Sequence, residues 1–98
     1  MSRSPGFDVC AVRGFHLTFA NGYTVSVQIG AGSYTENYDA DFDEFRDKRK
    51  VESMDAECAV FKDDGELIYH PLFDGSSVGS YMTPAQVLEL MNWAASQP

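Results

Sequence analysis

Few side chains in this 98-residue chain are of the types that carry out catalysis, and they are widely spaced. The cysteines are Cys10 and Cys58, and the histidines are His16 and His70. A cysteine nucleophile needs a base within hydrogen-bonding reach, but neither histidine has a sequence context that marks it as a base. The cysteines also lack the C-x-x-C spacing of metal and redox sites. We therefore expect two free thiols, with Cys58 buried as a small hydrophobic residue.

Aspartates at alternate positions form a second pattern that could do chemistry. Asp39, Asp41 and Asp43 resemble the start of an EF-hand calcium loop. That loop requires glycine at its sixth position and glutamate at its twelfth, where this chain has Glu44 and Lys50. A paired-carboxylate hydrolase is equally unsupported, because a dense run of acids does not show which two would face a substrate. We expect no metal site, no cofactor and no enzymatic activity.

The acidic residues stand out by their number and their distribution. The chain has 15 acidic and 7 basic residues, a net charge of −8, which disfavours direct binding to nucleic acid because phosphates would be repelled. Residues 36–66 contain 12 of the acids and five of the bases, a local net charge of 5 − 12 = −7. Plain solubility would explain this balance. The alternative is attraction to a basic surface, because arginine and lysine bind carboxylates and phosphates in the same geometry.

The candidate partner-binding residues are the acids of this central segment. The first group is Glu36, Asp39, Asp41, Asp43, Glu44 and Asp47, and the second group is Glu52, Asp55, Glu57, Asp63, Asp64 and Glu66. Aromatic residues are interleaved with the first group, namely Tyr34, Tyr38, Phe42 and Phe45. They could anchor an interface or pin the segment to the core, and the sequence leaves both possibilities open.

The length and composition predict one soluble folded domain over residues 1–98. A hydrophobic share of 44% and an aromatic share of 13% are typical of globular proteins. No run approaches the roughly 18 apolar residues of a membrane span, and the first residues lack the apolar core of a signal peptide. We expect a cytoplasmic protein that does not associate with membranes.

Alternating apolar residues predict a β-hairpin early in the chain. Residues 15–19 and 23–29 alternate apolar and polar side chains, and Asn21-Gly22 between them favours a type I′ turn. The glycine-rich residues 30–33 lack any phosphate-binding motif and predict a turn. Phe42 and Phe45 lie three residues apart, so a short helix in the acidic middle segment could bury both on one side. Acids would then lie near its start and the bases Lys48-Arg49-Lys50 near its end, as the helix dipole favours.

A second strand pair and a C-terminal helix are predicted in the remaining chain. Residues 56–61 alternate as a strand, residues 62–65 form a turn, and residues 67–69 return as the partner strand, followed by a loop over 71–80. The helix begins after Thr83 with a capping box and Pro84 at its first position, and Met82 and Val87 could form a hydrophobic staple. Its predicted apolar stripe consists of Val87, Leu88, Met91 and Ala95, widened by Leu90 and Trp93. The predicted fold class is α+β, with an antiparallel sheet of four or more strands packed against this helix.

Two stretches resemble small proteins of phages and mobile elements. They are residues 15–34, FHLTFANGYTVSVQIGAGSY, and residues 81–97, YMTPAQVLELMNWAASQ. Both are mainly structural, and neither carries a catalytic motif. With the size, the acidity and the central charge cluster, the chain is most similar to phage-encoded anti-CRISPR proteins that inhibit the type I-C system.

This resemblance implies a steric and electrostatic mechanism. The acidic surface would imitate duplex DNA and block a crRNA-guided surveillance complex from engaging its target. The implied partner is a protein with a basic nucleic-acid-binding groove, a subunit of the type I Cascade complex, in the cytoplasm of a bacterial host. The basic run Lys48-Arg49-Lys50 departs from a continuous acidic surface.

Two other functions remain open at this point. The chain could bind another host defence or regulatory protein through an aromatic and apolar surface, which would be insensitive to salt. It could also be an enzyme centred on Cys10, His16 or His70, for which single alanine substitutions are the test.

Overall fold

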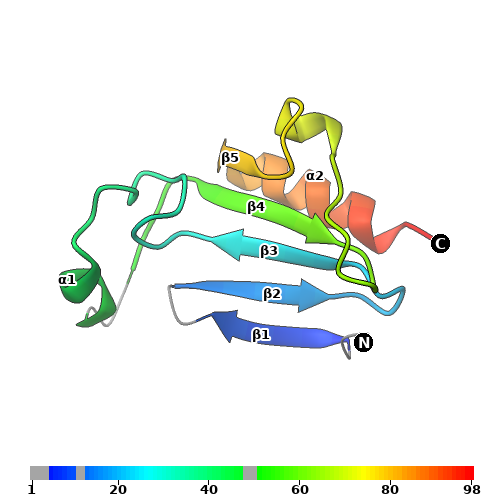
Figure 1. The fold of residues 1–98 in the computed structure, drawn as a ribbon, viewed down its shortest axis with the longest axis horizontal. Coiled ribbons are helices and arrows are strands. Elements are labelled where there is room, and N and C mark those ends of the chain that lie inside the picture. The colour runs from blue at the N-terminus through cyan, green and yellow to red at the C-terminus, as the bar shows by residue number, and fades with distance from the viewer. Residues whose placement is uncertain (1–4, 11–12, 48–50) are drawn as a thin grey trace.

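The computed structural model of the chain describes residues 5–10, 13–47 and 51–98. They form a five-stranded antiparallel sheet whose strand order follows the chain, with the C-terminal helix on one face (Figure 1). The strands are β1 (Gly6–Cys10), β2 (Gly14–Thr18), β3 (Thr24–Gln28), β4 (Ala56–Phe61) and β5 (Gly79–Met82), and the helices are α1 (Phe42–Asp47) and α2 (Pro84–Ala95). The predicted α+β class is therefore confirmed.

The predicted hairpin is formed by β2 and β3, but its turn is different. Phe15 pairs with Val27 and Leu17 with Val25. Gly22 has a φ of +89°, whereas Asn21 keeps a negative φ, and the Gly22 N–H donates to the carbonyl of Phe19 at 2.9 Å. This is the three-residue loop with glycine in the left-handed region, not the predicted type I′ turn.

The outer edge of β4 is covered differently from the prediction. Residues 67–69 do not form a strand, and Leu67 makes only an isolated bridge to Phe61. The chain then leaves the sheet through a 3-10 turn, Pro71–Phe73, and returns as β5, which pairs with the first half of β4. Part of the predicted loop over 71–80 is thus the fifth strand. Proline at position 71 has no backbone N–H to donate to a strand partner, which favours an exit from the sheet at this point.

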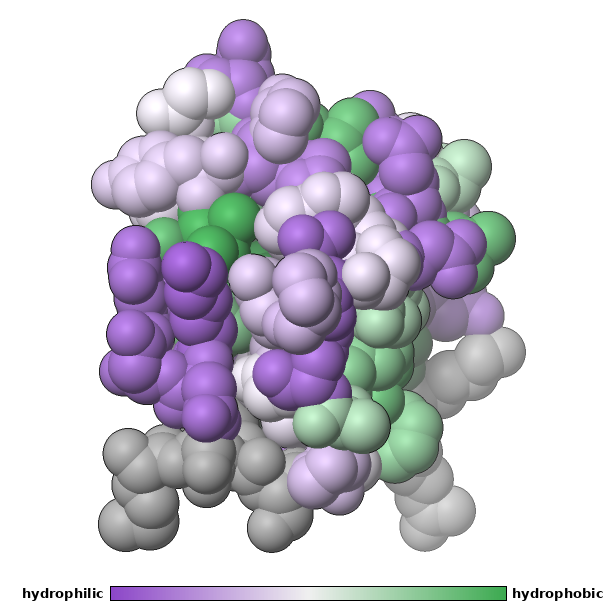
Figure 2. All heavy atoms as spheres, turned by 90° about the vertical axis from the view of Figure 1, so that its right-hand side faces the viewer, coloured by the Kyte–Doolittle hydropathy of each residue, from purple (hydrophilic) through white to green (hydrophobic). Residues whose placement is uncertain are grey.

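Strand register aligns two apolar rows on the face that carries α2. Residues directly opposite one another share a face of the sheet. One row is Phe7, Leu17, Val25 and Val60, and the other is Val9, Phe15, Val27 and Cys58. Helix α2 lies mainly over β3 and β4, so the buried core is at that half. In the lower half of an end-on view, hydrophilic residues lie on the left and hydrophobic residues reach the surface on the right, whereas the upper half is mixed (Figure 2).

Helix α2 begins as predicted, but a different line of side chains is buried. The Thr83 hydroxyl accepts a hydrogen bond from the Gln86 N–H, and the Gln86 side chain accepts one from the Thr83 N–H, which completes the capping box. Leu90 and Ala94 are fully buried, whereas Leu88 of the predicted stripe is 60% exposed. None of the helices among the described residues is long and apolar enough to cross a membrane.

Asn21 fixes the hairpin turn to the end of α2. Its amide Nδ2 donates to the carbonyls of Ala94 and Gln97 at 2.8 and 2.7 Å. Its Oδ1 accepts from the Tyr23 N–H at 3.0 Å. The last carbonyls of a helix have no partner within the helix, so a side chain from a distant hairpin supplies one here.

We expect the substitution Asn21→Asp to lower the free energy of unfolding by about 2 kcal/mol, measured by urea denaturation. The carboxylate removes both donated hydrogen bonds and places a negative charge at the negative end of the helix dipole. The matched control is Asn92→Asp, an exposed residue near the same helix end. Equal losses for the two variants would show that the bonds of Asn21 contribute nothing specific.

Candidate protein-binding surface

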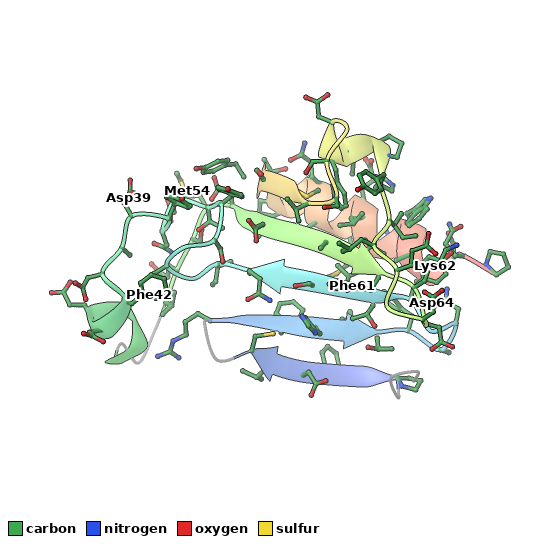
Figure 3. All side chains as sticks on the ribbon, viewed as in Figure 1. Asp39, Phe42, Met54, Phe61, Lys62 and Asp64 are labelled. Atoms are coloured by element: carbon green, nitrogen blue, oxygen red, sulfur yellow. The ribbon has the colours of Figure 1, made fainter. Side chains whose placement is uncertain are left out.

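The connection between β3 and β4 gathers most of the predicted site residues at one end of the molecule. We call this the acidic end, and it consists of Glu36, Asp39, Asp41, Asp43, Glu44, Glu52, Asp55 and Glu57. The remaining predicted acids, Asp63, Asp64 and Glu66, lie in the turn after β4. Figure 3 shows Asp39 and Asp64 at opposite ends of the sheet, in a molecule whose longest extent is 41 Å.

The predicted acids therefore do not form one surface. Asp47 is the last residue of α1, and its side chain lies outside the described part of the chain, as do the basic residues 48–50. The acidic end is thus defined by the connection that precedes β4 and by the first residues of β4. What holds that connection together decides which of its acids are available to a partner.

Asn37 joins the two stems of the connection. Its Nδ2 donates to the carbonyl of Ile29 at 2.8 Å and to that of Glu52 at 3.0 Å. Glu36 and residues 54–55 add a reciprocal pair: the Glu36 N–H donates to Asp55 Oδ1 at 2.8 Å, and the Met54 N–H donates to Glu36 Oε1 at 3.0 Å. These bonds join the two irregular stems of the connection, residues 29–37 and 52–55, without strand pairing.

Other carboxylates of the acidic end also accept backbone hydrogen bonds. Glu57 Oε2 accepts from the Tyr34 N–H at 3.1 Å. Asp41 Oδ1 accepts from the N–H groups of Asp43 and Glu44 at 2.9 and 3.1 Å, which caps the start of α1. Glu36, Asp41, Asp55 and Glu57 are therefore structural residues first, which the sequence alone does not reveal.

Two acids of the acidic end are exposed, and their carboxylates do not hold the backbone of the connection. Among the described residues, neither the Asp39 nor the Glu44 carboxylate accepts a hydrogen bond, and both side chains are exposed. They lie beside the framework made by Asn37 and Asp41, which fixes the backbone without using these two carboxylates. Asp39 and Glu44 are accordingly the acids best placed to contact a partner.

Aromatic and apolar side chains are exposed among these acids. Tyr34 and Tyr38 stack with ring centroids 5.3 Å apart and an interplanar angle of 8°, and they are 45% and 44% exposed. The Tyr81 N–H donates to the Tyr34 carbonyl at 2.9 Å, which places a third exposed tyrosine near the pair. Tyrosine faces surrounded by carboxylates form a surface suited to arginine and lysine side chains.

The prediction that α1 buries Phe42 is wrong. Its ring is 59% exposed and covers Gly32, where an added Cβ would come within 2.8 Å of the ring. The helix projects from the end of the sheet (Figure 3). The side chain of Phe45 lies outside the described residues.

The three candidates for an enzyme, Cys10, His16 and His70, do not come together, because Cys10 and His16 lie on the helix-free face of β1 and β2 whereas His70 packs against Trp93 of α2. Cys10 accepts a hydrogen bond from Gln28 Nε2 at 3.4 Å, and the ring of His16 packs against Phe61 at 6.1 Å. His70 is buried, its Nδ1 accepts from the Leu72 N–H at 3.1 Å, and its ring meets the Trp93 ring edge-on at 4.7 Å.

One juxtaposition among the titratable residues was not foreseen. Because β1 was not predicted, neither was the pairing of Asp8 with His16, which in turn lies opposite Ser26 on the helix-free face. Among the described residues, no group of three or more histidine, cysteine, aspartate or glutamate side chains could hold a metal ion.

Comparison with known proteins provides no relative from which a function could be transferred. No family model, no curated protein and no solved structure matches this chain.

Burial raises the pKa of the Cys58 thiol from 9.0 to about 12, with the nearby charge of Glu57 adding to the effect. The folded state therefore binds the thiol proton more tightly than the unfolded chain, and this contribution is complete below pH 9 and is lost as the pH rises towards 12. Above pH 9, we expect the stability difference between the native protein and Cys58→Ala to narrow by about 1.4 kcal/mol per pH unit. Urea denaturation at pH 8, 9 and 10 measures it, and pH-independent differences would contradict the buried, protonated thiol.

Removing the Asn37 side chain should loosen the acidic end while leaving the sheet intact. In Asn37→Ala we expect faster hydrogen exchange over residues 30–41 and a global stability within about 1–2 kcal/mol of the native value, because two hydrogen bonds to the stems are lost. Asn92→Ala is the control for a lost exposed amide. Unchanged exchange in the connection would show that other contacts hold it.

Proposed function

We propose that the acidic end occupies a basic groove built for nucleic acid, and that the protein is an inhibitor of the kind its sequence resembles. On this proposal it is an anti-CRISPR protein that binds a type I surveillance complex and keeps target DNA out. The observation that carries the proposal is the gathering of acidic residues around a stacked tyrosine pair at one end of the molecule.

A preorganised charge arrangement supports this function. The backbone around Asp39 and Glu44 is fixed by hydrogen bonds that do not use their carboxylates. A partner therefore does not have to order the segment on binding, and ordering is one of the main costs of association. Carboxylates held at fixed positions can replace phosphates in front of arginine and lysine side chains, since both groups accept the same bidentate bonds.

The exposed tyrosines supply a second kind of contact. Tyr34 and Tyr38 present the outer faces of a rigid stack, and tyrosine is enriched among the residues that dominate binding energy. An arginine of the partner that pairs with a carboxylate can also lie over a tyrosine ring. Such an arrangement combines charge with apolar contact, which a purely acidic surface lacks.

The acids at the opposite end do not share this contact. Asp63, Asp64 and Glu66 lie at the far end of the sheet (Figure 3), and charges separated by more than about 10 Å are largely screened at 0.1 M salt. They contribute to long-range attraction at low salt and provide an internal control for net charge.

We expect the double charge reversal Asp39→Lys/Glu44→Lys to weaken binding to a type I-C surveillance complex by about tenfold or more at low salt. The matched control Asp63→Lys/Glu66→Lys makes the same change in net charge at the other end and should weaken binding much less. Affinity is measured by surface plasmon resonance at two salt concentrations, with target DNA as competitor. Absence of binding by the native protein, or equal losses for both double variants, would overturn the proposal.

A second candidate function keeps the surface and changes the partner. Met54 is 75% exposed and its N–H donates a hydrogen bond to Glu36 of the acidic end, which favours an aromatic and apolar interface with another host defence or regulatory protein. In that case Tyr38→Ala would abolish binding to the partner, while raised salt and the charge reversals would have little effect.

A further inference from the structure

Half of the apolar face of the sheet is not covered by α2. In β1, Phe7 is 78% exposed and Val9 is 90% exposed, although both lie in the apolar rows that form the core further along the sheet. Phe15 and Leu17 of β2, on the same face, are half-buried. Exposed apolar residues that continue a core in this way mark interaction sites more often than isolated ones do.

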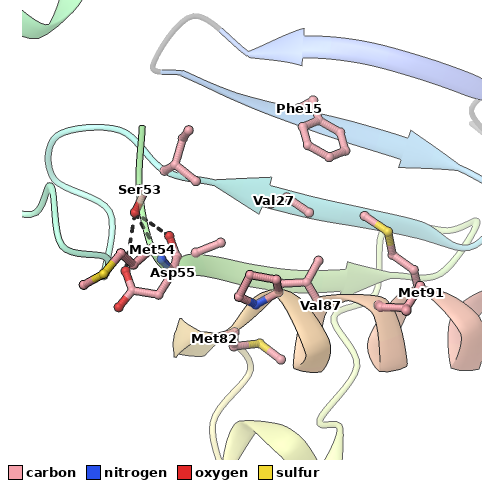
Figure 4. Close-up of a pocket in the computed structure, with 12 residues that line it drawn as sticks. Phe15, Val27, Ser53, Met54, Asp55, Met82, Val87 and Met91 are labelled. Carbon is pink, nitrogen blue, oxygen red and sulfur yellow. Dashed lines mark hydrogen bonds between the residues drawn. The ribbon is translucent and has the colours of Figure 1, made fainter. Parts of the chain in front are cut away.

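A groove runs between α2 and the neighbouring part of the same face, from β2 to the start of β4. It has a volume of about 340 Å³, and its lining includes Phe15, Val27, Met54, Val87, Leu88 and Met91. Figure 4 shows Phe15 and Val27 on the sheet side, Val87 and Met91 on the helix side, and Ser53, Met54 and Asp55 at one end. The predicted stripe of α2 that the core does not bury, which includes Leu88, thus faces an open groove.

The dimensions of the uncovered face match a helix. Two neighbouring strands span about 10 Å, because adjacent strands lie roughly 4.8 Å apart, and an α-helix with its side chains is about 10–12 Å across. A second helix lying beside α2 over β1 and β2 would complete the helical layer of this two-layer fold. It would cover Phe7, Val9 and Leu88 together.

Charge decides between a second copy of the chain and a different partner. Each copy has a net charge of −8, so two copies repel one another. The groove also ends at Met54 and Asp55, which are hydrogen-bonded to Glu36 of the acidic end. An occupant with positive charge at that end would be attracted where a second copy would be repelled.

We propose that the groove beside α2, together with the exposed apolar side chains of β1 on the same face of the sheet, binds an amphipathic helix of a partner protein, with an apolar stripe toward the sheet and basic residues toward Asp55 and Glu36. Residues at spacings of three and four along the partner helix would contact Phe15, Leu88 and Met91. Its positively charged N-terminal end would lie toward the acidic end. This site is separate from the carboxylates of Asp39 and Glu44, and the inference does not depend on a CRISPR partner.

The test uses the full chain and a synthetic peptide of about 18 residues with leucines on one helical face and lysines on the other. A second peptide replaces every lysine by glutamate. Fluorescence anisotropy should show that the leucine–lysine peptide binds, that it becomes helical by circular dichroism, and that the leucine–glutamate peptide binds at least about tenfold more weakly.

Matched protein variants locate the binding. Val9→Gln/Leu88→Gln replaces one exposed apolar residue of β1 and one of the groove and should weaken peptide binding about tenfold or more. Leu67→Gln/Tyr69→Gln replaces two exposed apolar residues elsewhere and should leave it unchanged, with folding of both variants checked by thermal denaturation. Asp39→Lys/Glu44→Lys should still bind the peptide at raised salt, because the apolar contacts of the groove are unchanged. The same variant should lose binding to the surveillance complex, so the two proposals can fail independently.

Three results would overturn the proposal. The first is no binding of the leucine–lysine peptide to the native protein. The second is equal binding to both glutamine variants, which would mean that the peptide is held by charge alone. The third is self-association of the native protein, measured by light scattering, that Val9→Gln/Leu88→Gln abolishes, since a second copy would then cover the face.

Discussion

The pairing register of β3 and β4 is the constraint on which the rest of the structure depends. It sets Val25 beside Val60 and Val27 beside Cys58, and Leu90 of α2 closes over this patch with no exposed surface of its own. Burial of such side chains is the main favourable term in folding. Because one helix and two central strands form this core, the connections at both ends of the sheet and the outer strand β1 do not have to be apolar and can serve other purposes.

Local patterns in the sequence predicted the hairpin of β2 and β3, the strand β4 and the helix α2, because each is marked by alternation, turn residues or a helix cap within a few residues. The two edge strands, β1 and β5, were not predicted. The dipeptide Asn21-Gly22 marks a turn, and Thr83-Pro84 begins a capping box that marks the start of a helix. Each signal spans no more than four residues. In contrast, β1 has only Phe7 and Val9 as an alternating pair, and β5 contains Gly79 and an irregular register opposite Ala56 and Cys58. Both are edge strands, and they form because their backbones pair with a neighbouring strand, which their own sequences do not reveal.

The candidate site was predictable in its composition but not in its division of roles. Counting acids identifies the connection as strongly charged, yet it cannot separate Asp39, which is exposed, from Glu36, whose carboxylate accepts a hydrogen bond from a residue far along the chain. The same holds for Glu57, which binds the Tyr34 N–H. Those roles depend on contacts between segments, and an acid that orders a loop has the same local sequence appearance as one that faces a partner.

The strand order follows the chain, so every strand pairs with its neighbour in sequence. The longest connection between paired strands is that of residues 29–55, between β3 and β4. Closing a loop costs conformational entropy that grows slowly with its length, and here the loop also compresses many like charges into one end. The folding rate of the protein is therefore tied to ionic strength. Salt that screens the connection lowers the barrier to forming the central strand pair, so the surface suited to a basic partner also slows the chain's own folding at low salt.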